Sequence, residues 1–109
     1  MNETEQHSFF DAMKDKGIIK GTVAVSKCGH DRGRIYVVFS EHESFLNLCE
    51  GDKRSPENPK KKRRNHVCPL GQIQNAGEWI DSLKTLPTEV QNSEIRKKIR
   101  TFLDRHMDM

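Results

Sequence analysis

Residues 21–39 read GTVAVSKCGHDRGRIYVVF, and this stretch gives the clearest evidence for a fold. Residues 22–26 are rich in β-branched side chains, which predicts a short strand. Gly29 and Gly33 then stand in a six-residue stretch, and glycine permits the positive φ that a tight loop between strands requires. Residues 34–39 are apolar on both faces, so they predict a second strand near the centre of a curled sheet.

The chain beyond residue 39 continues this pattern of short strands. Residues 45–49, FLNLC, predict a third strand, and the EGD that follows at 50–52 predicts a turn. His66, Val67 and Cys68 predict a short final strand. Short strands joined by glycine turns are typical of a small barrel. We therefore expect a barrel whose main strands lie near residues 22–27, 34–40 and 44–50.

Residues 53–64 predict an exposed arm with neither strand nor helix. Pro56 and Pro59 exclude a helix there, and the many charges exclude a core. The five consecutive cations at 60–64 include no acidic residue, so only a polyanion would relieve their mutual repulsion. Residues 59–64 also resemble a nuclear-import signal, which is a second interpretation of the same charges.

The C-terminal part of the chain, residues 71–109, predicts one or two amphipathic helices. Asn75 and Glu78 have the spacing of a capping box, and Thr88 to Gln91 repeat it. Pro87 ends the first helix. The apolar stripes comprise Trp79, Ile80, Leu83 and Leu86 in the first helix, and Val90, Ile95, Ile99, Phe102 and Leu103 in the second. We expect both stripes to pack on the barrel.

Charge divides the 109 residues into three parts. Residues 1–16 form an acidic leader of net charge −2, in which Phe9, Phe10 and Met13 predict a short helix. Residues 17–70, the predicted barrel with its arm 53–64, carry eleven Lys and Arg against six Asp and Glu. Residues 71–109, the helical appendage, are neutral. A basic excess confined to the middle segment indicates a polyanionic partner.

Nothing in the sequence predicts secretion or membrane insertion. Residues 1–7 are acidic and polar, unlike a signal peptide, and no apolar run approaches the roughly 18 residues of a membrane span. The three cysteines are few and odd in number, so they do not indicate a disulfide framework. Free thiols are usual in a reducing compartment. We therefore expect a cytoplasmic protein with no membrane partner.

Residues 21–34 closely resemble a KOW motif, in which two strands flank a basic loop with two spaced glycines; residues 35–39 are the second strand here. This segment is similar to KOW-containing large-subunit ribosomal proteins of archaeal and eukaryotic type. The whole chain is most similar to short bacterial KOW-domain RNA-binding proteins. Residues 59–66, PKKKRRNH, sit where those proteins carry a Lys-rich run that ends in His, and residues 92–99 resemble their C-terminal helix.

The resemblance covers residues 17–67 well and residues 88–103 less well, and it leaves out the acidic leader. It implies a mainly β fold, a small SH3-like barrel of KOW type followed by one or two amphipathic helices. It also implies contact with RNA, above all ribosomal RNA, and association with the ribosome.

The expected RNA-binding side chains come from the loop and from the arm. Exposed backbone N–H groups of a glycine-rich loop can face phosphate oxygens, and basic side chains beside it attract the same polyanion. The loop would position the RNA backbone on a rigid hairpin, and the arm would add charge on a flexible tether. Tyr36 offers a ring for base stacking, although we expect it to pack in the protein. The candidates are Lys27, Gly29, His30, Arg32, Gly33 and Arg34 in the loop, and Lys53, Arg54, Lys60, Lys61, Lys62, Arg63 and Arg64 in the arm.

Other classes of function have weaker support. Cys28 with His30, and His66 with Cys68, would give four soft ligands on adjacent strands, but a spacing of one residue is unusual for zinc. We therefore expect no metal or cofactor. Cys28 activated by His30 would lack a group that orients the base and an oxyanion site, so we expect no enzyme. The main rival is a protein-interaction adaptor, like the KOW modules of transcription elongation factors. Exposed apolar stripes on the C-terminal helices would favour it.

Overall fold

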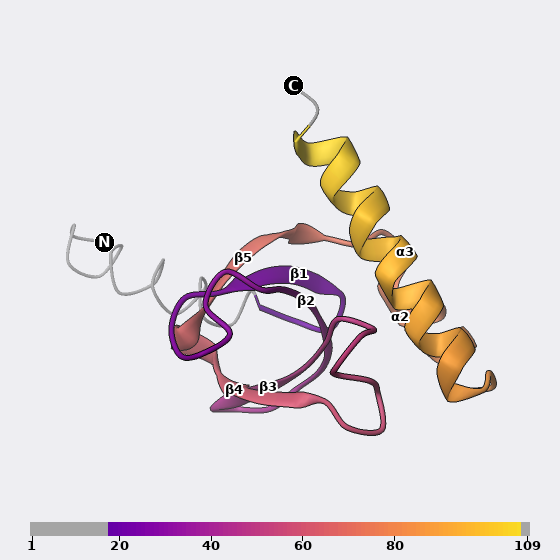
Figure 1. Cartoon of the computed structure of the whole chain (residues 1–109), viewed down its shortest axis with the longest axis horizontal. Coiled ribbons are helices and arrows are strands. Elements are labelled where there is room, and N and C mark those ends of the chain that lie inside the picture. The colour runs from indigo at the N-terminus through magenta and orange to yellow at the C-terminus, as the bar shows by residue number, and fades with distance from the viewer. Residues whose placement is uncertain (1–17, 108–109) are drawn as a thin grey trace, which may run out of the picture.

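The computed structural model describes residues 18–107, in which one antiparallel sheet is followed by two helices (Figure 1). The acidic leader, with the helix expected in it, lies outside the described residues. A 3₁₀ turn, η1 (Arg64–His66), joins the fourth strand to the fifth. The strands are β1 (Thr22–Ser26), β2 (Ile35–Glu41), β3 (Phe45–Cys49), β4 (Lys60–Arg63) and β5 (Val67–Gln72), and the helices are α2 (Ala76–Leu83) and α3 (Thr88–Met107).

The three strands expected from the alternating pattern are confirmed, and so are the helices after residue 75. The strand order is β4-β3-β2-β1-β5, so β2 is central, as its apolar character predicted. The sheet curls strongly (Figure 1), but β4 and β5 are its two edges and no ladder pairs them within residues 18–107. We expected a closed barrel, and residues 18–107 form a curled five-stranded antiparallel sheet.

The expectation of an arm without strand structure is wrong for residues 60–63. These residues form the edge strand β4, which pairs with β3 so that Lys62 lies opposite Leu46. The backbone hydrogen bonds of this ladder and the pairing of Lys62 with Asp31 outweigh the charge repulsion within the run. The final strand is also longer than expected and contains Pro69. A proline is tolerated there because β5 is an edge strand and the β1–β5 register shifts between Val23 and Ala24.

Both faces of the sheet are buried. Successive side chains of a strand point to opposite faces, so Tyr36 and Val38 enter the concave side while Val37 enters the convex side. The inner core, within the curl, comprises Ile18, Ala24, Tyr36, Val38, Leu46, Leu48 and Val67. The outer core, beneath the helices on the outside of the curl (Figure 1), comprises Val23, Val37, Cys49, Ile73, Ala76, Leu83, Ile95, Ile99 and Phe102.

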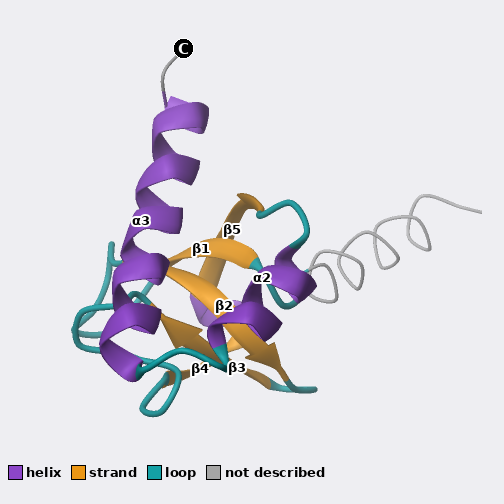
Figure 2. Cartoon of the chain, turned by 90° about the vertical axis from the view of Figure 1, so that its right-hand side faces the viewer, coloured by secondary structure: helices purple, strands orange, loops and turns teal. Residues whose placement is uncertain are grey.

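The helices pack on the sheet with their apolar stripes, as expected (Figure 2). One predicted member, Val90, is instead 42% exposed, and the neighbouring Gln91 is buried. The side-chain amide of Gln91 donates to the Leu83 carbonyl (2.7 Å), which ties α3 to the end of α2. Neither helix among the described residues is long and apolar enough to span a membrane.

The predicted capping boxes do not form. Asn75 does precede α2, but it has a left-handed backbone (φ 55°) and its side chain makes no cap hydrogen bond. Thr88 is the first residue of α3, and the Gln91 N–H donates to the Pro87 carbonyl (2.9 Å) rather than to the Thr88 hydroxyl, which itself donates to the Glu57 carboxylate (2.7 Å). The spacing of the residues therefore located the helix starts correctly but not the contacts made there.

Candidate nucleic-acid interface

The loop between β1 and β2, residues 27–34, is a tight structure closed by its own backbone. Gly29 and Gly33 both have φ of +90°, as the sequence predicted. The N–H groups of Arg32, Gly33 and Arg34 donate to carbonyls of Gly29, Ser26 and Asp31, at 2.9–3.2 Å. These three N–H groups are thus already used within the loop and are not available to phosphate oxygens, in contrast to the expectation for a glycine-rich loop.

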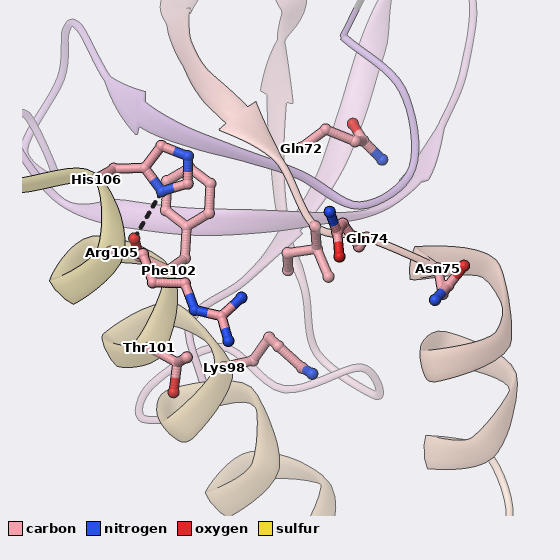
Figure 3. Close-up of a pocket in the computed structure, with 9 residues that line it drawn as sticks. Gln72, Gln74, Asn75, Lys98, Thr101, Phe102, Arg105 and His106 are labelled. Carbon is pink, nitrogen blue, oxygen red and sulfur yellow. Dashed lines mark hydrogen bonds between the residues drawn. The ribbon is translucent and has the colours of Figure 1, made fainter.

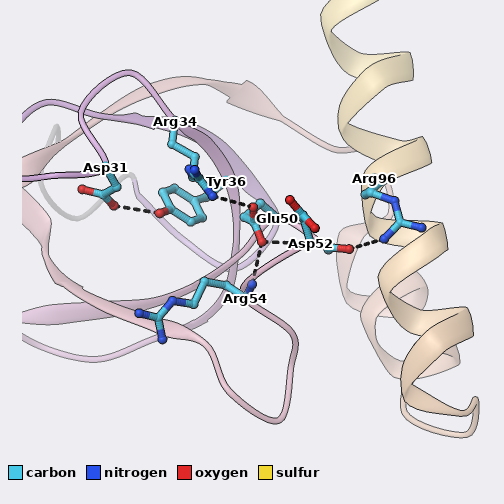
Figure 4. Close-up of polar contacts among 8 residues, drawn as sticks. Asp31, Arg34, Tyr36, Glu50, Asp52, Arg54 and Arg96 are labelled. Carbon is cyan, nitrogen blue, oxygen red and sulfur yellow. Dashed lines mark hydrogen bonds and ion pairs between the residues drawn. The ribbon is translucent and has the colours of Figure 1, made fainter.

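Asp31 is the centre of a polar network that joins this loop to β4. One carboxylate oxygen accepts from the Lys62 ammonium (2.6 Å) and from the Ser26 hydroxyl (3.0 Å). The other accepts from the Tyr36 hydroxyl (2.7 Å), as Figure 4 shows. Lys62 also donates to the carbonyl of Cys28 (2.8 Å). We call these four side chains and the Cys28 carbonyl the Asp31 network.

The network keeps Asp31 ionised. Burial alone raises the pKa of Asp31, but the hydrogen bonds from Lys62, Tyr36 and Ser26 and the positive charge of Lys62 lower it more. The net effect holds the pKa of this carboxyl well below its usual range. Burial, followed by the hydrogen bond to Asp31, raises the pKa of the Tyr36 hydroxyl far above its usual value. Tyr36 is 2% exposed, so it packs in the core and is not available for base stacking.

Lys62 is therefore a structural residue and not a cation of a solvated arm. It is 8% exposed, and its charge is paired inside the sheet. Its neighbours Lys61 and Arg63 are exposed, because alternate side chains of β4 point to opposite faces. The alternation of side chains along β4 thus separates the cations: Lys62 points inward, and its neighbours Lys61 and Arg63 point outward.

Arg34 is likewise committed to a contact within the protein. Its guanidinium pairs with Glu50 (3.1 Å), although the sequence predicts it as an RNA-binding residue of the loop (Figure 4). The second oxygen of Glu50 accepts from the backbone N–H groups of Asp52 (2.9 Å) and Arg54 (2.6 Å), which closes the turn after β3. The Arg96 guanidinium on α3 donates to the Gly51 carbonyl, so this turn is fixed to the helix.

Arg64 also stabilises the fold. Its Nε donates to the carbonyls of His42 (2.9 Å) and Glu43 (3.1 Å), and one terminal nitrogen donates to the carbonyl of Ile18 (2.8 Å). These contacts connect the turn η1 to the β2–β3 hairpin and to the start of the described chain. Of the thirteen candidate residues, Lys62, Arg34 and Arg64 thus have clear roles within the protein.

The other basic candidates remain at the surface. Lys27, His30 and Arg32 are exposed on the loop, as are Lys61 and Arg63 on β4 and Lys53 after β3, while Lys60 and Arg54 are half-buried. The ion pairs found within residues 18–107 are Arg34–Glu50, Lys62–Asp31 and Lys84–Asp81, so none involves these surface cations. The Asp31 network links the loop to β4. Their exposed cations therefore belong to two segments held in a fixed relation, rather than to a hairpin and a tether.

The aromatic residues of this region were missed by the sequence analysis. The rings of His42 and Phe45 stack with centroids 4.3 Å apart and planes 16° from parallel. The Lys61 ammonium lies 4.1 Å from the centroid of the Phe45 ring. The register between β3 and β4 places Phe45 opposite Arg63. The proximity of this ring to the cations could be predicted only if β4 were known to be a strand.

A second polar feature lies where β5 and the segment before α2 meet α3. A shallow pocket of about 360 Å³ is lined there, among others, by Gln72, Gln74, Lys98, Arg105 and His106 (Figure 3). The His106 ring stacks on Phe102 at 3.9 Å, with its Nδ1 2.9 Å from the Phe102 carbonyl oxygen. Within residues 18–107, no three His, Cys, Asp or Glu side chains converge as a metal site would require.

Comparisons with protein-family models and with curated proteins gave no match for this chain. The resemblance to KOW proteins therefore rests on the sequence of residues 21–34, 59–66 and 92–99 alone.

Proposed function

We propose that this protein binds RNA through the exposed cations of the loop 27–33 and of β4, and that it acts at the ribosome. The observation that carries the proposal is the Asp31 network: it holds a glycine loop with Lys27 and Arg32 against a basic strand that presents Lys61 and Arg63. Cations held in a fixed arrangement lose less side-chain and loop freedom on binding a polyanion than cations on a flexible arm.

We also propose that the curled sheet is an SH3-like barrel of KOW type that is open between β4 and β5. Three features support this: five short antiparallel strands, the two-glycine loop between β1 and β2, and the single 3₁₀ turn that joins the two edge strands. The resemblance of residues 21–34 to the KOW motif also implies binding to RNA, with ribosomal RNA as the expected target.

The adaptor alternative has less support. Its distinguishing observation would be an exposed apolar stripe on the helices, but Ile95, Ile99 and Phe102 are buried against the sheet. Among residues 18–107, the exposed large apolar side chains are Ile19 before β1, Leu70 on β5 and Val90 on α3, which are far apart in the sequence. Isolated exposed apolar side chains are normal on a protein surface.

The proposal predicts a salt dependence that is specific to the exposed cations of the loop and of β4. If Lys27, Arg32, Lys61 and Arg63 each contact a phosphate, changing all four to Gln should flatten the log–log salt slope for single-stranded RNA by about 2.8, or about 0.7 per contact. The matched control changes four other exposed cations, Lys84, Lys97, Arg100 and Arg105, to Gln. It removes the same charge, and we expect a much smaller change in slope.

The measurement is fluorescence anisotropy of a labelled structured RNA with single-stranded loops, over a series of salt concentrations, with circular dichroism to check folding. Equal slopes for both quadruple variants would mean that only total charge matters, and would contradict binding through these four cations. No binding by the unaltered protein would favour the adaptor function instead. Crosslinking in cells followed by sequencing of the bound RNA then tests whether that RNA is ribosomal.

A further inference from the structure

We propose that the stacked His42–Phe45 rings, flanked by Lys61 and Arg63, bind one unpaired base of the RNA. This inference rests on the proposed RNA-binding function and adds to it the class of target, a single-stranded segment rather than a duplex. The sequence analysis considered only Tyr36 as a ring for base stacking, and Tyr36 is buried.

The ring pair is held in place before any ligand arrives. The His42 N–H donates to the Phe45 carbonyl (2.9 Å), which closes the β2–β3 hairpin. Asn47 Nδ2 lies 3.3 Å from His42 Nε2 and also donates to Ser40 Oγ (2.9 Å), so the imidazole is fixed at its edge. Arg64 binds the His42 carbonyl from the other side of the hairpin. Preorganised rings lose little freedom when a base stacks on them.

The ring of the pair that can be reached from solvent is His42, because Phe45 has His42 stacked on one face and the Lys61 ammonium over the other. His42 is exposed and Phe45 is half-buried, whereas Tyr36, the ring considered first, is enclosed. An open hollow beside Phe45 is lined by Ser44, Lys61 and Arg63 in addition to the ring itself. Stacking on aromatic rings is the common way in which proteins hold unpaired bases, and it tolerates any base because every base has a π face.

The charge around the rings fits a nucleotide better than an apolar partner. Lys61 and Arg63 flank Phe45 on β4 and would take the phosphates on either side of a stacked base. Glu43 is exposed and lines a neighbouring hollow with Arg63 and Arg64, where it would repel phosphate. The backbone of the RNA should therefore run past Lys61, which lies farther from Glu43 along β4 than Arg63 does.

The experiment uses the full chain and a 12-nucleotide RNA with 2-aminopurine at its centre, free or annealed to its complement. We expect His42→Ala and Phe45→Leu each to weaken binding of the single strand by about 5- to 150-fold, the range of base–aromatic stacking. Duplex binding and the salt slope should not change, since no charge is removed. Phe45→Tyr keeps the ring and should keep the affinity.

Phe39→Leu is the matched control, because Phe39 is a partly buried ring packed on the outer core instead. It should leave both RNAs bound as before. In the unaltered protein, 2-aminopurine fluorescence should fall on binding, and in His42→Ala this fall should be lost; His42 is exposed, so that variant should fold.

The outcomes separate the two proposals. If the unaltered protein binds neither RNA, the proposed function is wrong and the base site with it. If it binds RNA but His42→Ala and Phe45→Leu leave the single-strand affinity and the fluorescence change intact, only the base site is wrong. Equal weakening of single strand and duplex would also contradict the base site, because a stacked base must be unpaired.

Discussion

Two tight loops of this protein are organised in the same way but end in different roles. In each, a carboxylate collects hydrogen bonds: Asp31 in the β1–β2 loop and Glu50 in the turn after β3. In each, glycine supplies a positive φ. The first loop is held by Lys62 from within the curl of the sheet, and its basic side chains Lys27, His30 and Arg32 are exposed. The second is fixed to α3 through Gly51, and Glu50 pairs with the nearby Arg34.

The difference shows that basic residues near a glycine turn do not by themselves mark a binding surface. What matters is which face of the turn the protein itself uses. A Cβ at Gly33 would meet no atom within 4 Å, whereas a Cβ at Gly51 would lie 2.4 Å from the Asn92 carbonyl oxygen. The first glycine serves backbone conformation alone, while the second also permits the close approach of a helix.

The two carboxylates should differ in what they contribute to stability. Asp31→Asn leaves the Lys62 ammonium buried without its counter-charge, and we expect the free energy of unfolding to fall by about 2–4 kcal/mol. Glu50→Gln leaves Arg34 unpaired, but that side chain is 37% exposed and water can solvate it, so about 1 kcal/mol is expected. Urea unfolding measures both. Equal losses would show that the two loops are stabilised alike.

The glycines offer a second way to test the comparison. Gly51→Ala combines an unfavourable positive φ with a clash against α3, so we expect a loss of about 2–3 kcal/mol. Gly33→Ala meets only the conformational cost, about 1 kcal/mol. The same urea series compares them. A Gly33→Ala loss as large as that of Gly51→Ala would mean that the β1–β2 loop has a packing role as well.

The acid stability of the protein should depend on Asp31. Because its folded pKa lies below the value of about 3.9 in an unfolded chain, the ionised carboxylate stabilises the fold above that pH. This stabilisation is lost as the pH falls below about 4. The gap in unfolding free energy between the natural protein and Asp31→Asn should thus be constant from pH 7 to 5 and should narrow by about 1–2 kcal/mol towards pH 2.5. A constant gap throughout would contradict the network.

Much of the fold is predictable from the sequence because its periods are clear. Residues 34–39 are predicted to be apolar on both faces, and the structure places residues 35–39 in a strand that is buried on both faces. Strand β4 was not predictable, since no alternation of apolar and polar residues marks four consecutive cations. Its inward position is occupied by Lys62, whose charge is acceptable there only because Asp31, from a distant part of the chain, lies beside it.

The candidate site was predictable as a region but not residue by residue. The glycine spacing identified the loop, and the charge run identified the basic segment, although not that it forms strand β4. Which cations face solvent depends on partners that are distant in sequence: Asp31 for Lys62, Glu50 for Arg34, and carbonyls of the β2–β3 hairpin for Arg64. The stacked rings of His42 and Phe45 likewise depend on how a hairpin closes, which composition does not reveal.

The most direct test of the account compares three adjacent single variants, Lys61→Met, Lys62→Met and Arg63→Met, in two measurements. We expect Lys62→Met to lower the free energy of unfolding by about 2–4 kcal/mol and to leave the salt slope of RNA binding unchanged. Lys61→Met and Arg63→Met should each flatten that slope by about 0.7 while changing the unfolding free energy by no more than about 0.5 kcal/mol. If all three variants instead flatten the slope equally and none alters stability, residues 60–64 are a uniform flexible arm and the account is wrong.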